Sequence, residues 1–185
     1  KDLLLPDDAP AAGAACRARF VPPADGKYVV ELRDNRFKAG GKYFLRIGNF
    51  PLATTSHPIG VQRRVPTSVG LVGPNVEGVT PLQLLATDVA NRTSLSIGSA
   101  WTTVVLGELP TFVESANTKD PQTVPIALHG VLSAAKEKDE FPLSIAKGQR
   151  VTFKPISRSV GSPATCSLKL LNAAGGTVGE AAITE

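Results

Sequence analysis

The 185-residue chain contains no methionine, two cysteines, one tryptophan and two histidines. Cys16 and Cys166 match neither a CxxC motif nor a metal-ligand spacing, and two histidines can scarcely supply the ligands of a zinc site. No apolar run approaches the roughly 18 residues of a membrane span, and no basic and apolar leader is present. We therefore expect no zinc and no membrane insertion. We also expect a mature product or an excised piece, with any signal peptide outside it.

Catalytic motifs are lacking too. No serine lies in a G-x-S-x-G motif, and "IGSAW" and "SVGSP" read as turns without a base in recognisable context. His57 precedes Pro58 in a turn, and His129 precedes Gly130 at the end of a strand, so we expect a structural or exposed role for both. The sequence predicts that the chain is not an enzyme.

The net charge of +4 does not by itself indicate nucleic-acid binding. The cations are dispersed, with the densest groups in "RDNRFKAGGK" and "QRR", and no helix carries a basic stripe. We expect no nucleic-acid partner, although a weak attraction to anionic envelope polymers remains open.

What the sequence does contain is typical of many short strands. It is 42% hydrophobic, mostly Val, Leu, Ala and Ile, and its 17 glycines and 15 prolines are spread along it as turn residues. "CRARFVP", "KYVVELRD" and "KYFLRIG" alternate between apolar and polar residues, and Asp25-Gly26 and Gly40-Gly41 supply turns between them. The predicted fold class is all-β, with antiparallel β-sandwiches.

The sequence pattern differs in residues 51–123. It predicts a small immunoglobulin-like sandwich followed by a polar linker. Its strands are expected around Thr67–Val72 and in "SAWTTVVLGEL", with Trp101 in the core. "TPLQLLATDVANRT" suits either a helix begun by Thr80 and Pro81 or a strand, and the β neighbours favour the strand. Six apolar residues are expected to be buried in this unit: Val69, Leu71, Leu82, Leu84, Val104 and Leu106.

Two other stretches resemble a known family. "VPIALHGVLSAAKEKDEFPLSIAKGQRVTFKPISRSVGSPATCSLKLLNAAGGTV" is similar to the first half of a bacterial pre-peptidase C-terminal (PPC) domain. "PADGKYVVELRDNRFKAGGKYFLRIGNFP" is similar to the second half. Between them, "FPLATTSHPIGVQRRVPTSVGLVG" resembles the start of the immunoglobulin-like module that alternates with PPC domains in repeat-containing planctomycete surface proteins.

The resemblance implies an unusual domain organisation. Residues 1–50 together with 124–185 would form one PPC-like β-sandwich from its two halves, and residues 51–123 would be the inserted immunoglobulin-like module and linker. Each half alone would expose an unpaired edge and half a core. The halves are therefore expected to unite within one chain, as in a circular permutant, or between chains in a domain-swapped homo-oligomer.

Two candidate sites follow from this assembly. Asp7, Asp8, Asp139 and Glu140 could converge on calcium, although solvated loop acids are the favoured interpretation because calcium loops usually carry denser Asp and Asn runs. An extracytoplasmic chain with two cysteines most often pairs them, and a Cys16–Cys166 disulfide would contribute on the order of 4–5 kcal/mol in the chain-entropy model. Two buried free thiols are the alternative.

The function expected from these residues is a non-catalytic, extracytoplasmic β-sandwich segment, secreted, periplasmic or at the cell surface. It would act as a structural spacer, adhesion or targeting module beside other domains of a larger parent protein. The alternative is a carbohydrate- or collagen-binding module appended to a secreted hydrolase, with an extracellular polysaccharide or protein fibre as its partner.

Overall fold

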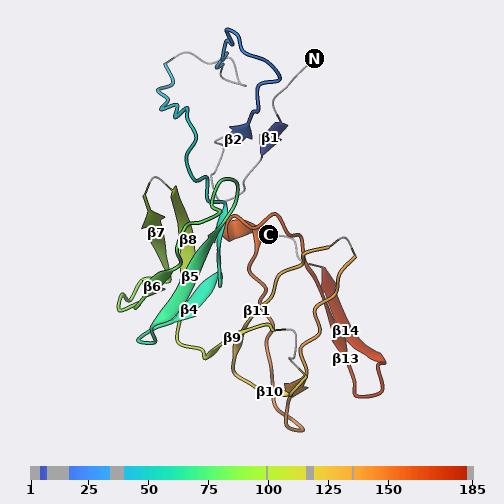
Figure 1. The fold of residues 1–185 in the computed structure, drawn as a ribbon. Helices are drawn as coiled ribbons and strands as arrows, with labels where there is room; N and C mark the ends of the chain where they lie inside the picture. Colours follow the sequence, from blue (N-terminus) through green and yellow to red (C-terminus); the bar gives the residue numbers. More distant parts are fainter. Residues whose placement is uncertain are drawn as a thin grey trace.

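The computed structural model describes residues 5–7, 17–33, 40–98, 100–115, 119–134 and 136–182, with side chains left out at 5–7, 17–19 and 182. Its regular elements are short strands and one 3-10 turn, so the described chain is all-β, as the sequence predicts. None of the described residues forms a helix long and apolar enough to cross a membrane. Figure 1 shows the N-terminal segment at the top, the strands of the middle region below it and the C-terminal strands at the lower right.

The middle region consists of two three-stranded sheets. One has the order β3-β5-β6 and is antiparallel, and the other has the order β4-β8-β7. In the second sheet β7 and β8 are antiparallel, whereas β4 runs parallel to β8, which the prediction of purely antiparallel sheets does not include. The strands are β3 (Thr55–His57), β4 (Gly60–Gln62), β5 (Thr67–Val72), β6 (Leu82–Leu84), β7 (Arg92–Ile97) and β8 (Ala100–Gly107).

The two middle sheets share one apolar core. Val69 of β5 and Val104 of β8 are both 0% exposed, and Leu71 and Leu84 pack against the cluster from the first sheet. Burial of apolar side chains from both sheets is the main stabilising contribution available to so small a unit. The fully buried members of the core are Val61, Val69, Ala86, Leu95, Val104 and Leu106.

Most of the apolar residues predicted to be buried in the middle region are found in or against this core, but two expectations are wrong. Leu82 is 42% exposed because β6 is an edge strand, of which only Leu84 reaches the core. Trp101 is 53% exposed because β8 turns Ala100 and Thr102 inward and the residue between them outward.

Arg63 holds a loop of the middle region through its guanidinium group. The side chain is almost completely buried and donates hydrogen bonds to the carbonyl oxygens of Asp88, Val89 and Ala90. It also forms an ion pair with Glu108, with 2.9 Å between Nη1 and Oε1. One charged group therefore satisfies three successive carbonyls of the loop between β6 and β7.

The C-terminal region is attached to the middle region through β9 (Thr111–Val113) and β11 (Ala127–His129), which pair in parallel. Further along the chain, Arg92 donates a hydrogen bond to the carbonyl oxygen of Ser159, and Val160 in the 3-10 turn η2 (Arg158–Val160) is 0% exposed. The remaining strands are β10 (Gln122–Thr123), β12 (Leu143–Ser144), β13 (Ser167–Leu171) and β14 (Thr177–Ala182).

Among the described residues no strand pairing joins the two terminal parts, and the sandwich expected from both, within one chain or between two, stays a prediction. β1 (Leu5–Asp7) pairs only with β2 (Arg17–Arg19), and β13 pairs only with β14. The stretches 27–33 and 40–47, expected as strands, are not in strands. The physical reason is visible in Figure 1, where the N-terminal segment and the β13–β14 hairpin lie at opposite ends of the molecule, with other strands between them. A strand cannot form without a neighbour to hydrogen-bond to.

The complete burial of Val104 predicts that a shorter side chain at this position lowers the stability of the protein. Val104→Ala should lower the free energy of unfolding by about 2 kcal/mol, since two buried carbons are lost and a cavity remains. Val89→Ala is the matched control, because Val89 is 97% exposed and its loss should change stability by less than about 0.5 kcal/mol. Urea unfolding measures both. Equal effects of the two variants would contradict a core centred on Val104.

Candidate functional site

Titratable side chains gather where β9 and β11 run side by side. Glu114 follows β9 directly, and His129 is the last residue of β11. The backbone N–H of Glu114 donates to the carbonyl oxygen of His129 over 2.7 Å, which extends the parallel pairing by one residue. The sequence places His129 correctly at a strand end, but the partnership with Glu114 follows from the parallel register and was not predicted.

Glu114 and Asp139 form a carboxyl pair above Gly130. A Cβ atom at Gly130 would lie 2.6 Å from Oδ2 of Asp139 and 2.8 Å from Oε2 of Glu114, so glycine leaves the space that both carboxyl groups use. Partial burial raises the pKa of Glu114 above 4.5. The charge of Asp139 and a hydrogen bond between the two groups raise it further, whereas the backbone of Val131 lowers it. Glycine at position 130 therefore lets two carboxyl groups come close together, and this disfavours the ionised form of Glu114.

The two histidines of the chain lie close enough at this junction for His57 to act electrostatically on His129. The ring of His129 lies against Gly60, at 3.5 Å from a Cβ built there, and its Nε2 is buried without a hydrogen-bond partner. Burial, followed by the neighbouring His57, lowers the pKa of His129 from 6.5 to about 4. His129 is thus neutral at physiological pH and acts here as a packing residue between the middle and C-terminal regions.

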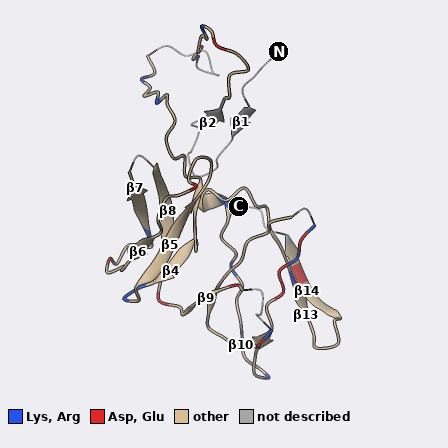
Figure 2. Ribbon diagram, viewed as in Figure 1, with Lys and Arg blue, Asp and Glu red and all other residues tan. Residues whose placement is uncertain are grey.

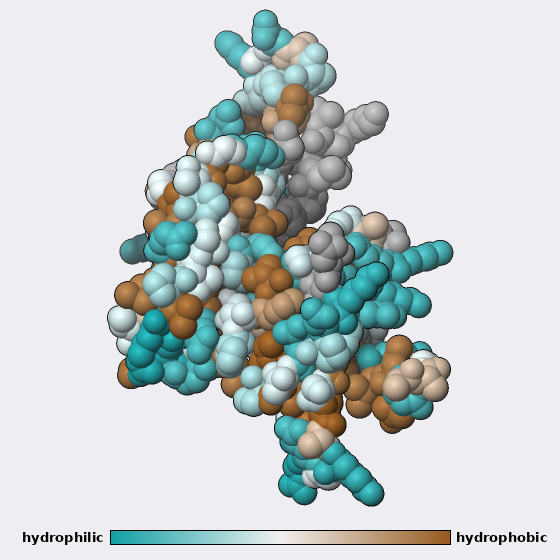
Figure 3. All heavy atoms as spheres, turned by 60° about the horizontal axis from the view of Figure 1, so that its bottom comes forward, coloured by the Kyte–Doolittle hydropathy of each residue, from teal (hydrophilic) through white to brown (hydrophobic). Residues whose placement is uncertain are grey.

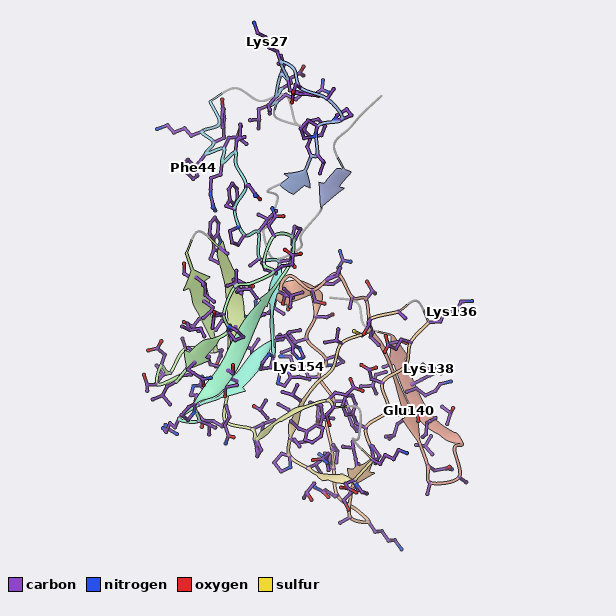
Figure 4. The ribbon with its side chains drawn as sticks, viewed as in Figure 1. Lys27, Phe44, Lys136, Lys138, Glu140 and Lys154 are labelled. Carbon is purple, nitrogen blue, oxygen red and sulfur yellow. The ribbon has the colours of Figure 1, made fainter. Side chains whose placement is uncertain are left out.

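The four acids predicted for calcium do not come together as a described site. Asp139 is half-buried beside Glu114, and Glu140 is exposed (Figure 4). Asp7 belongs to β1 at the other end of the molecule, and Asp8 lies outside the described residues. Among the residues described, no three His, Cys, Asp or Glu side chains are grouped so that they could hold a metal ion. The calcium prediction gains no support here.

The disulfide prediction is also without support. Cys166 is half-buried and carries a free thiol. Cys16 lies outside the described residues. A Cys16–Cys166 bridge stays a prediction.

An aromatic contact that was not predicted joins the N-terminal segment to β8. The guanidinium carbon of Arg46 lies 4.1 Å from the ring centre of Phe50 and 4.9 Å from that of Trp101. Such cation–π contacts contribute about 0.5–1 kcal/mol when exposed. The outward position of Trp101 on β8 creates this site, and its signal in the sequence is the alternation of "SAWTTVVLG".

The N-terminal segment exposes an unusual number of large apolar side chains. Val29 is 93% exposed, Phe44 86%, and Tyr43 and Ile47 75% each. Figure 4 shows Phe44 on this segment, above the sheet that contains β7 and β8, and Figure 3 shows brown apolar atoms reaching the surface in several places. Concentrated exposure of this kind is characteristic of surfaces that meet another protein.

A second apolar surface lies on the β13–β14 hairpin. One face of the hairpin forms a shallow hollow of about 280 Å³. The opposite face carries Lys169 and Glu180, whose Nζ and Oε2 atoms are 3.6 Å apart. The side chains that line the hollow include those of Phe153, Pro155, Leu168, Leu170 and Ala181, and Gly179 lies among them.

The charged residues do not form a single binding patch. Figure 2 shows Lys and Arg spread over the described ribbon, with Asp and Glu between them. Surface charges dispersed in this way give no concentrated field for a polyanion. The two apolar surfaces, and the junction of β9 with β11, are therefore the features with functional potential.

The lowered pKa of His129 predicts a loss of stability in acid. A folded-state pKa of about 4, against 6.5 in the unfolded chain, disfavours protonation, so stability is complete above pH 6.5 and falls as the pH drops towards 4. The full contribution is roughly 3 kcal/mol as an upper bound. His129→Phe should remove most of this slope in urea unfolding between pH 7 and 4. His57→Gln should remove only a small part, and an unchanged slope in His129→Phe would refute the assignment.

The carboxyl pair predicts a shift that NMR can follow residue by residue. Asp139→Asn should lower the pKa of Glu114 towards 4.5, because the neighbouring negative charge is removed. Titration of the Glu114 side-chain carboxyl ¹³C signal measures the change. Glu140→Gln is the matched control, since Glu140 does not contribute to the shift of Glu114, and its effect should be negligible. A Glu114 pKa that stays raised in Asp139→Asn would show that burial, with a contribution from Glu137, is responsible and Asp139 is not.

Comparisons with models of protein families, with curated proteins and with solved structures found no match to this chain. The resemblance of the terminal stretches to PPC domains therefore stays a prediction from the residues that carry it. The functional argument has to rest on the geometry of the described surfaces.

Proposed function

We propose that this chain is a non-catalytic β module that acts as a structural spacer or adhesion unit of a larger extracytoplasmic protein. The observation that carries the proposal is the combination of unpaired strand-like segments with exposed apolar side chains at both ends of the molecule. Exposed edges and apolar faces of this kind are normally covered in a finished domain. A module that has them uncovered is suited to contact with another β protein.

The N-terminal surface supports the proposal because its apolar residues follow a strand pattern. Tyr43, Leu45 and Ile47 alternate with Lys42, Phe44 and Arg46, and the first three are between 44% and 75% exposed. The C-terminal surface supports it because β13 and β14 form a sheet of only two strands, which is marginal by itself. The extracytoplasmic location rests on the PPC resemblance alone.

The alternative function is binding of a carbohydrate or a collagen-like fibre, and one observation favours it. Trp101 is half-exposed beside Phe50, and exposed aromatic rings are the usual stacking surface for sugars. Arg46 already lies over both rings, which leaves less aromatic surface for a ligand. We therefore rank this function second.

Retention on immobilised ligands tests the proposal. The full chain is passed over surfaces carrying the same chain, a panel of polysaccharides, or fibrillar collagen. The proposed function predicts retention on the immobilised chain and none on the polymers. Retention on a polymer that Trp101→Ala abolishes would instead support the alternative, and turnover of a generic hydrolase substrate would overturn the non-catalytic assignment.

A further inference from the structure

We propose that residues 42–47 of one copy of this chain add as a third strand to the free edge of β14 in a second copy. This inference rests on the proposed function and names the partner that it requires. The contact would be β-augmentation, in which main-chain hydrogen bonds provide affinity and alternate side chains provide specificity.

The acceptor is the outer strand of the C-terminal hairpin. Residues 177–181 of β14 are all exposed. Among the described residues, β13 is the only strand that pairs with β14. Its second edge therefore offers a row of backbone donors and acceptors. Gly179 and Ala181 lie on the face of the apolar hollow. A glycine and an alanine at these positions leave room for large side chains from an added strand.

The donor is a stretch without regular secondary structure that has no strand neighbour among the described residues. Its six residues match the six of β14, a length of roughly 20 Å when extended. Tyr43, Leu45 and Ile47 lie on one side of such a strand by alternation. These three side chains are 75%, 44% and 75% exposed in one copy. They are therefore free to fill the hollow of a second copy.

The charges of donor and acceptor are complementary in the same alignment. With the apolar residues of the donor over the hollow, Lys42 is on the opposite face of the sheet, which is the face that carries Glu180. Glu180 is exposed and is already near Lys169 of β13, at 3.6 Å. With the six donor residues antiparallel to the six of β14, Phe44 lies directly opposite Glu180, and Lys42 and Arg46 are its diagonal neighbours on that face. Glu180 would therefore lie between Lys169 and these two cations.

The occupant is a second copy because the donor and acceptor of one chain are far apart in the fold. Figure 1 shows residues 42–47 above the sheet of β7 and β8, and β14 at the lower right beyond the middle and C-terminal strands. A contact between two different surfaces is heterologous, so it produces open chains or closed rings of copies, and the smallest ring is a dimer in which each copy donates to the other. Head-to-tail growth of this kind fits a spacer or adhesion module.

The experiment uses two variants of the full chain that each damage one surface. Leu45→Asp places a charge on the donor side that would enter the hollow, and Ala181→Asp places one in the hollow. The wild-type chain should form a concentration-dependent series of oligomers in analytical ultracentrifugation. Each variant alone should associate at least tenfold more weakly. A 1:1 mixture of the two should form a heterodimer and stop there, because one intact donor and one intact acceptor remain.

The matched control is Val89→Asp, which puts the same charge on a residue that is 97% exposed in the middle region. It should associate like the wild type. Near-ultraviolet circular dichroism, reporting on Trp101, checks that each variant is folded. A peptide of residues 40–49 should also bind the wild-type chain, protect the amides of β14 from hydrogen exchange and fail to bind Ala181→Asp, which tests the acceptor without any change to the donor.

Three results would overturn the inference. If both variants associate like the wild type, self-association uses another surface and the proposed function stands without this contact. If only Leu45→Asp blocks association, the donor pairs with its own counterpart in a symmetric dimer. If the wild type stays monomeric and the peptide does not bind, the contact does not exist, and retention on polymers then decides the proposed function separately.

Discussion

The fold depends on one apolar contact, between the inner faces of the β3-β5-β6 and β4-β8-β7 sheets. Val69 and Val104 lie at its centre and are completely removed from solvent. Among the described residues, every buried member of this cluster comes from positions 61–106. Because roughly 25 cal/mol is gained for each Å² of apolar surface removed from water, this small core is where the chain offsets most of its ordering entropy.

The C-terminal region is attached to the middle region by strand pairing, by the packing of one histidine ring and by a side-chain hydrogen bond. β9 leaves the middle region and pairs with β11, His129 packs against Gly60, and Arg92 binds the carbonyl of Ser159. These contacts hold the region in place without a large shared apolar surface. The two ionisable groups at the junction respond to pH in opposite directions, since Glu114 favours its protonated form and His129 its neutral form.

The local pattern of the sequence predicts the middle region well and the terminal regions poorly. Thr67–Val72 and the β8 stretch were recognisable because alternation of apolar residues coincides with a strand that has neighbours on both sides. "KYVVELRD" and "KYFLRIG" have the same alternation, but they are not in strands, because a period of two indicates the capacity for pairing and not the presence of a partner. The prediction that Trp101 lies in the core is wrong because it relied on the aromatic residue type. The inward orientation of Ala100 and Thr102, its neighbours on β8, turns Trp101 outward. The Glu114–Asp139 pair depends on a parallel register between β9 and β11, for which no local signal exists.

The attachment of the loop at residues 88–90 by Arg63 has a consequence for engineering the protein. This loop is exposed and lies between two strands, which usually recommends a site for inserting a tag or a foreign domain. Its three successive carbonyls all accept hydrogen bonds from the guanidinium group of Arg63. An insertion there would leave the nearly buried guanidinium group of Arg63 without these acceptors. A lysine at position 63 could not replace the arginine, because it lacks the planar fork of donors. The turn at Gly175, where Asn172 and neighbouring backbone satisfy one another locally, is the safer place to open the chain.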